Sequence, residues 1–257
     1  MKLIENIGSN LLLFFSKVGS TIIFLINTFK QITKKNFPKK ELIENILKIG
    51  YSSLPVIMVT SFFTGMVLAF QTGTYMESKI KGIARYMGAG IALTMVRELG
   101  PVLTSLLIAG RSGSAIAAEI GTMKITEQID ALTVMGINPL QYVVLPKVIA
   151  GMISFPLLVI FADLMGIIGG ALIATIVVGQ PIGIYFSGIR TLIDFSQVFH
   201  GLFKSIFFGL SVTFLSCYNG YNVMGGSREV GIATTKAVVS GNMSVFILDY
   251  IVTSIAI

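Results

Sequence analysis

One uncharged stretch constrains this fold more than any other feature of the chain: residues 49–76 contain no Asp, Glu, Lys or Arg. The hydrocarbon core of a bilayer is about 30 Å thick, and about 20 helical residues are enough to cross it. The stretch is therefore long enough to pass through a membrane as a single helix. It predicts a membrane-spanning element rather than part of a soluble core.

The composition extends this prediction to the whole chain. Hydrophobic residues make up 54% of the sequence and charged residues 12%, with a mean hydropathy of +0.85. A soluble domain usually carries about twice that charge. We predict an all-α, multi-pass membrane protein with about five spans. They lie near residues 49–76, 86–110, 148–179, 197–217 and 237–257.

The first 49 residues differ in character from the rest of the chain. Apolar residues recur at helical spacing, and Lys17 and Lys30 interrupt them. This pattern predicts an interfacial amphipathic helix, followed by a short basic helix after Pro38. The alternative is a first spanning helix near residues 7–26. The chain then divides into an N-terminal segment, 1–49, and a membrane domain, 50–257.

The basic residues are distributed unevenly along the chain. Eight of the nineteen Lys and Arg residues precede Tyr51. If the N-terminus is cytosolic and the chain crosses the membrane five times, the N-terminal segment and the loops 111–147 and 219–236 lie inside. Together they carry thirteen basic residues. Five basic residues then lie outside: Lys79, Lys81, Arg85, Arg190 and Lys204. Because positive charge favours the cytosolic side, we expect the N-terminus there.

Arg97 and Glu98 stand inside the second predicted span. A charge at the middle of a membrane costs roughly 2.5–3.5 kcal/mol. Consecutive helical residues point in directions about 100° apart, so these two side chains do not simply pair with each other. Two interpretations remain open. The charges are either a polar feature of a cavity or part of an interhelical ion pair that fixes packing.

Small residues recur every four positions after these charges, at Ala109, Gly113, Ala117 and Gly121. Such a strip allows helix backbones to approach closely, so we interpret it as a packing surface.

A short amphipathic helix is predicted near residues 119–135, where Gly136 and Pro139 would end it. Its polar residues are Glu119, Lys124, Glu127, Gln128 and Asp130. An exposed helix with an acidic face and an apolar edge can dock into a groove of a soluble partner. The alternative is a plain solvated loop.

Catalytic and metal-binding motifs are missing from the sequence. No GxxxxGK[ST] phosphate-binding loop occurs. One cysteine, Cys217, excludes an intramolecular disulfide, and one histidine, His200, excludes a histidine-based zinc site. We therefore expect no enzyme activity, no metal and no cofactor bound by this chain. The basic balance suits a membrane surface better than nucleic acid.

Several motifs follow one another along residues 50–257, at 64–71 (TGMVLAFQ), 97–101 (RELGP), 109–115 (AGRSGSA), 118–121 (AEIG), 127–132 (EQIDAL), 219–221 (NGY) and 231–239 (GIATTKAVV). Together and in this order they resemble the MlaE permease family of lipid-transporting ABC systems, which includes plastid envelope counterparts. The resemblance implies a permease subunit that moves phospholipid or a related lipid between membranes.

The resemblance also implies partners and a place in the cell. A homodimer would bind two copies of a separate ATPase, which uses ATP, and the segment around 119–132 would couple to that ATPase. An MCE-domain lipid-binding protein would act on the opposite side. The membrane would be a bacterial inner membrane or a plastid inner envelope, with the N-terminus on the cytosolic or stromal side. Our candidates for the lipid cavity are Phe62, Phe63, Met66, Phe70, Gln71, Arg97 and Glu98.

Two other functions compete with this one. The chain could be an ATP-independent secondary transporter or channel that uses Arg97, Glu98 and Asp163 as a charge path. It could also be a membrane scaffold that transports nothing.

Overall fold

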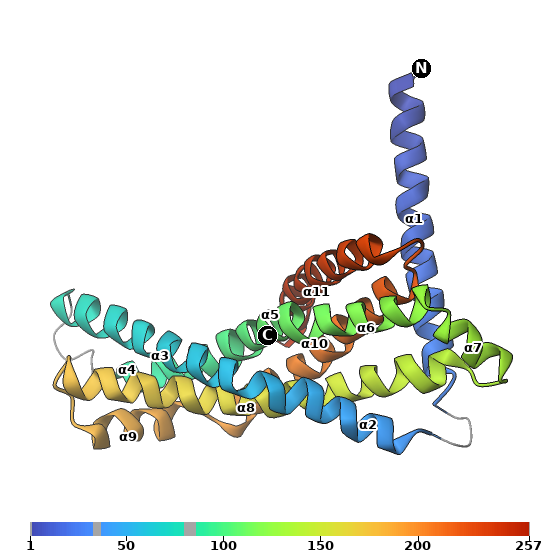
Figure 1. Cartoon of the computed structure of the whole chain (residues 1–257). Coiled ribbons are helices and arrows are strands. Elements are labelled where there is room, and N and C mark those ends of the chain that lie inside the picture. Colours follow the sequence, from blue (N-terminus) through green and yellow to red (C-terminus); the bar gives the residue numbers. More distant parts are fainter. Residues whose placement is uncertain (1, 33–36, 80–85, 257) are drawn as a thin grey trace.

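The computed structural model describes residues 2–32, 37–79 and 86–256 (Figure 1). Every regular element in these ranges is helical, which confirms the predicted all-α class. Four of the basic residues used to predict the orientation lie outside the described residues: Lys34, Lys35, Lys81 and Arg85.

Five helices in the described part of the chain are long and apolar enough to cross a membrane. By length and composition they are Lys39–Thr74, Met87–Ile125, Leu140–Ile176, Phe195–Tyr221 and Ser227–Ile255. This confirms the predicted multi-pass organisation. The helices extend beyond most of the predicted spans, because charged residues mark where a bilayer would end and do not by themselves end a helix.

The first of these helices packs along the third. The elements α2 (Lys39–Ile46), η1 (Leu47–Tyr51) and α3 (Ser52–Lys79) follow one another without a break, and α3 lies beside α8 (Leu145–Ile176) (Figure 1). A Cβ atom on Gly65 of α3 would overlap the backbone carbonyl of Gly166 of α8. Glycine at both positions therefore allows the two backbones to touch.

A continuous helix of 39 residues, here called the central helix, covers residues 87–125. Its parts are α4 (Met87–Thr94), η3 (Met95–Leu99), α5 (Gly100–Ile108), η4 (Ala109–Gly113) and α6 (Ser114–Ile125). The π-helical turns η3 and η4 each take in an extra residue, which rotates the following side chains around the axis. All but the first residue of the predicted span 86–110 lies inside this helix. The helix continues past residue 110 because residues 111–125 contain no proline.

Two more long helices pack on the central helix, α10 (Phe195–Tyr221) and α11 (Ser227–Ala256). The main hydrophobic core forms where these helices and α8 meet, around Ile108, Phe155 and Phe208. The short helix α9 (Ile182–Leu192) covers α4 at one end of the bundle (Figure 1).

The N-terminal helix α1 (Lys2–Phe29) runs across the direction of α8 and extends beyond the bundle (Figure 1). The ring of Phe24 anchors it, with centroids 5.3–5.8 Å from those of three aromatic residues near the end of α10. These are Phe214, Tyr218 and Tyr221. A helix in this orientation is not parallel to the spans.

Candidate functional site

Arg97 and Glu98 lie in the π-helical turn η3, directly before Pro101. Proline has no backbone N–H, so the Arg97 carbonyl has no donor four residues further along the helix. A carbonyl in this position would be left without that hydrogen bond inside a membrane, where no water replaces it. The sequence RELGP therefore creates a backbone acceptor as well as two charges.

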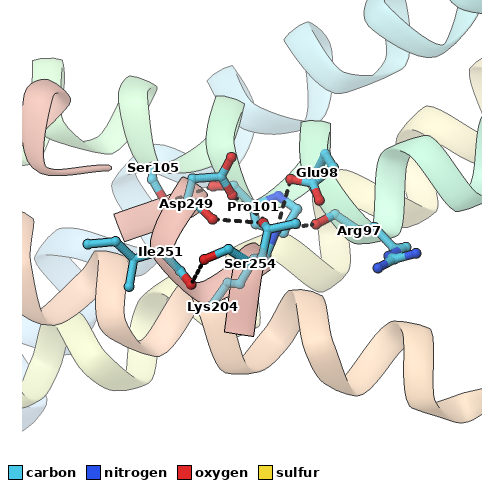
Figure 2. Close-up of polar contacts among 9 residues, drawn as sticks. Arg97, Glu98, Pro101, Ser105, Lys204, Asp249, Ile251 and Ser254 are labelled. Atoms are coloured by element: carbon cyan, nitrogen blue, oxygen red, sulfur yellow. Dashed lines mark hydrogen bonds and ion pairs between the residues drawn. The ribbon is translucent and has the colours of Figure 1, made fainter. Parts of the chain in front are cut away.

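The ammonium group of Lys204, on α10, fills this place (Figure 2). The residue is 3% exposed. Its Nζ atom donates to Glu98 Oε2 at 2.8 Å, to Asp249 Oδ1 at 3.0 Å and to the Arg97 carbonyl at 3.2 Å. An ammonium group has three N–H donors, and here each has an acceptor. We call Lys204, Glu98, Asp249 and Arg97 the Lys204 cluster.

A glycine one turn before the lysine explains how α10 comes so near. A Cβ atom on Gly201 would collide with the carbonyl oxygen of Val96. Because Gly201 has none, α10 lies directly against η3. Lys204 then reaches its three acceptors from within the helix contact.

Two carboxyl groups of this cluster, those of Glu98 and Asp249, share the one ammonium group of Lys204. Figure 2 shows the Arg97 side chain directed away from that ammonium group. Among the described residues, no hydrogen bond or ion pair holds the Arg97 guanidinium. The cluster therefore offers a free planar cation, which suits an anionic group such as a phosphate.

Glu98 thus forms an interhelical ion pair, whereas Arg97 does not. The other charge of the competing transport path, Asp163 on α8, is not part of the cluster. Its carboxylate packs against Gly100, and Oδ1 has no hydrogen-bond partner in the described part of the chain.

The predicted lipid-cavity residues of α3 lie on a different element. Phe63, Phe70 and Gln71 are exposed, whereas Phe62 and Met66 are half-buried. Among the described residues, no hydrogen bond or ring contact joins this set to the Lys204 cluster. Within one chain, the structure therefore does not bring the two halves of the predicted cavity together.

The four small residues of the packing strip are all buried on the central helix: Ala109, Gly113, Ala117 and Gly121. The strip faces α10 and α11. A Cβ atom on Gly113 would lie 2.9 Å from Ser216 Oγ, and one on Gly121 would lie 3.3 Å from Val223 and Val230.

The segment predicted as one helix near 119–135 is divided. The helix α6 ends at Ile125, and α7 (Gln128–Val134) follows after Glu127. Glu127 has a φ of 59°, a left-handed backbone conformation that interrupts a helix. Lys124 and Asp130 join the two parts through an ion pair of 2.9 Å, and Gln128 donates to Thr126 Oγ1 at 3.1 Å.

Glu119 belongs to a second cluster and not to the face of α7. Lys147 of α8, also 3% exposed, donates to Glu119 Oε1 at 2.9 Å and to Asn45 Oδ1 of α2 at 3.1 Å. Lys48 lies 3.9 Å from the same carboxylate oxygen. We call these residues the Lys147 cluster. It ties α2, α6 and α8 together.

Sequence reasoning missed the two lysines and Asp249. Lys204 was assigned to the outer surface, but the structure buries it between helices, because three acceptors there compensate its charge. The signal was present, since Lys204 and Asp249 stand inside two predicted spans with opposite charges. Opposite charges in separate spans indicate a pair.

Comparisons with known proteins agree with this architecture. Residues 42–255 match the family model described as Permease MlaE. The chain is 36% identical to the intermembrane phospholipid transport system permease protein MlaE of Haemophilus influenzae, over 98% of this chain and 96% of that protein.

Two more relatives come from other lineages. A probable ABC transporter permease protein of Rickettsia typhi is 36% identical, over 97% of this chain and 95% of that protein. The chloroplastic protein TRIGALACTOSYLDIACYLGLYCEROL 1 of Arabidopsis thaliana is 35% identical, over 87% of this chain and 63% of that protein. The match to the family model and the near-complete coverage of two relatives together establish that this chain belongs to the MlaE permease family.

Proposed function

We propose that this chain is the membrane permease subunit of an ABC transporter that moves phospholipid between membranes, powered by a separate ATPase. The names of the Haemophilus and Rickettsia relatives support the proposal. The sequence has no phosphate-binding loop, which agrees with an ATPase on another chain. The free Arg97 guanidinium within a spanning helix provides a partner for a lipid phosphate.

The exposed apolar edge of α7 is the observation that supports binding to an ATPase. Val134 is 89% exposed and Met135 is 65% exposed, while Ile129 on the other side of α7 is buried. The helix follows the central helix without being part of a span. Asp130, one turn before Val134, pairs with Lys124 at the surface. This surface fits a groove on a soluble subunit.

The assembly that we propose is a twofold homodimer with an ATPase on each copy of α7. Apolar residues cover the outward faces of α3 and α11, including Phe63, Phe70, Phe246 and Tyr250. These faces would line a lipid cavity between two copies, which would join the α3 residues to the Lys204 cluster. An MCE-domain protein would deliver or receive lipid at the end of the bundle opposite α7.

The proposed membrane is a bacterial inner membrane or a plastid inner envelope. The N-terminus and α7 would face the cytosol or stroma. The orientation of α1, across the spans, supports an interfacial N-terminal helix.

The test combines copurification with activity. The chain is expressed with its ATPase subunit as wild type and as Val134→Glu, and the bound ATPase and ATP-driven lipid transfer between vesicles are measured. We expect Val134→Glu to lower the amount of bound ATPase by at least about tenfold, because a buried unpaired charge in an interface costs several kcal/mol. Val134→Leu keeps the apolar edge and should retain the ATPase.

Full ATPase retention by Val134→Glu would contradict the assignment of α7. Loss of the ATPase from both variants would also contradict it, since Leu preserves the chemistry on which the argument depends.

A further inference from the structure

A buried aspartate, Asp163, lies at the middle of the predicted span 148–179 and takes no part in the Lys204 cluster. It is 7% exposed, and its Oδ1 atom has no hydrogen-bond partner among the described residues. In the same ranges, no lysine, arginine or histidine lies within ion-pair distance of it. An ionised carboxylate here would therefore keep the full cost of a charge inside a membrane, with no partner to offset it.

The carboxyl group stands against the backbone of the π-helical turn η3. A Cβ atom on Gly100, the residue directly after η3, would overlap Asp163 Oδ1 and would lie 2.8 Å from the carbonyl oxygen of Met95. These two oxygen atoms therefore approach the same point, where Gly100 has no side chain. If the carboxyl group is ionised, both oxygens are acceptors and repel each other. A proton on Oδ1 makes that group a donor and turns the repulsion into attraction.

The Met95 carbonyl has room for a second hydrogen bond. It accepts the backbone N–H of Gly100, which is the bond that closes η3. A carbonyl oxygen has two lone pairs, so it can also accept the O–H of a carboxylic acid. The same helix, α8, holds the Met95 side chain, because a Cβ atom on Gly166 would overlap Met95 Cε. Asp163 and Gly166, about one turn apart, thus lie against the backbone and the side chain of one residue of η3.

We propose that Asp163 is a neutral carboxylic acid that donates its O–H to the Met95 carbonyl and so fixes the π-helical turn that carries Arg97 and Glu98. From α10, Lys204 donates to the Arg97 carbonyl in the same turn at 3.2 Å. Asp163 is then a positioning residue for the Lys204 cluster and not a member of a charge path. The effect on lipid transfer rests on the proposed function, but the proton on Asp163 can be measured without transport.

The first experiment detects this proton in the full chain with its ATPase subunit, in vesicles at neutral pH. Infrared difference spectroscopy separates the C=O stretch of a protonated carboxyl group from that of an ionised one. We expect a band of a protonated acid in the wild type that shifts in D₂O and is missing from Asp163→Asn. The matched control is Asp194→Asn, the same substitution at an exposed aspartate, which should leave the band in place.

The second experiment measures ATP-driven lipid transfer and melting for two variants of Asp163. Asp163→Asn places an amide N–H where the O–H stood, so transfer should stay near that of the wild type. Asp163→Leu is neutral and of similar size but has no donor. Transfer by this variant should fall about fivefold, the factor that corresponds to one hydrogen bond. Rescue by Asn and not by Leu separates hydrogen bonding to η3 from the mere filling of space.

Three results would overturn the proposal. A protonated-acid band that is absent from the wild type, or unchanged in Asp163→Asn, would show that Asp163 is ionised. Loss of transfer by Asp163→Asn with unchanged melting would show that transfer needs the carboxyl group itself, as in a charge path. Transfer by Asp163→Leu equal to that of the wild type would show that η3 needs no donor from α8.

Misfolding and loss of function have separate signatures. If Asp163→Leu does not fold, the infrared band and the transfer by Asp163→Asn still decide the proposal. A wild type that moves no lipid would overturn the proposed function, whereas the infrared band would still show whether Asp163 carries the proton.

Discussion

Two buried lysines hold the two parts of the central helix in different ways. Lys204 pairs with Glu98 in η3, and Lys147 pairs with Glu119 in α6. Both lysines are 3% exposed, and the two glutamates are 38% and 42% exposed at their side chains. The glutamates are 21 residues apart, which corresponds to about 30 Å of helix. The exposed fractions of the lysines and glutamates therefore do not distinguish the Lys204 cluster from the Lys147 cluster.

The difference lies in the second partner of each lysine. Lys147 adds a neutral amide, that of Asn45, and the exposed Lys48 lies 3.9 Å from the same Glu119 oxygen, so here one carboxylate has two lysines in reach. Lys204 adds a second carboxyl group, that of Asp249, so two carboxyl groups share one lysine, and Arg97 points away from them. A carboxylate with two lysines in reach suits a structural role. Two carboxyl groups that share one lysine beside a free cation suit ligand binding, and we infer that the Lys147 cluster fixes the fold while the Lys204 cluster handles lipid.

Removing Lys204 should have the largest effect. Lys204→Ala leaves two carboxylates and a backbone carbonyl without their donor inside the spans. Breaking a buried ion pair in this way costs about 3–5 kcal/mol. We expect a much lower melting temperature in detergent, measured by the loss of the helical circular dichroism signal. We also expect no lipid transfer. Wild-type melting would show that water already compensates these carboxylates.

Removing Lys147 should have a smaller effect on stability. Lys147→Ala leaves one carboxylate, which still has Lys48 at 3.9 Å, together with the amide oxygen of Asn45. An unsatisfied buried acceptor costs about 1–3 kcal/mol. Melting should occur at a lower temperature, while transfer per folded complex should stay near that of the wild type below that temperature. If transfer is lost while melting is unchanged, the comparison between the two lysines is wrong.

Lys48 should matter least. Its Nζ lies 3.9 Å from Glu119, and its side chain is 64% exposed. Exposed pairs of this kind contribute about 0–1 kcal/mol. Lys48→Gln should therefore melt with the wild type within experimental error. A shift as large as that of Lys147→Ala would show that Lys48, and not Lys147, compensates Glu119.

The sequence was sufficient for the class of the fold and for the order of the spans. An uncharged stretch such as residues 49–76 is apolar on every side of the helix, so the length of the span can be read directly from the sequence. For the same reason, the sequence did not show which way each helix faces. Lys204 and Glu98 are 106 residues apart, and their contact depends on the rotation of two apolar helices.

Local backbone detail was also beyond the sequence. The π-helical turn η3 and the left-handed Glu127 follow from packing and not from a recognisable pattern. The charges of Arg97 and Glu98 were visible, but their separation into one free and one paired side chain was not. The charges of Glu98, Lys204 and Asp249, which lie in three different predicted spans, could have suggested the ion pairs. They could not have shown that Arg97 is free.

Lipid transfer by Arg97→Gln tests the central claim most directly. The variant is reconstituted with its ATPase, and ATP-driven transfer of a fluorescent phospholipid between vesicles is measured beside melting. Because Arg97 has no partner in the described part of the chain, we expect melting within about 0.5 kcal/mol of the wild type. Loss of a charge-assisted bond to a lipid phosphate, worth about 1.5–3 kcal/mol, should slow transfer at least about tenfold. Wild-type transfer by Arg97→Gln would contradict the assignment of the Lys204 cluster to lipid handling.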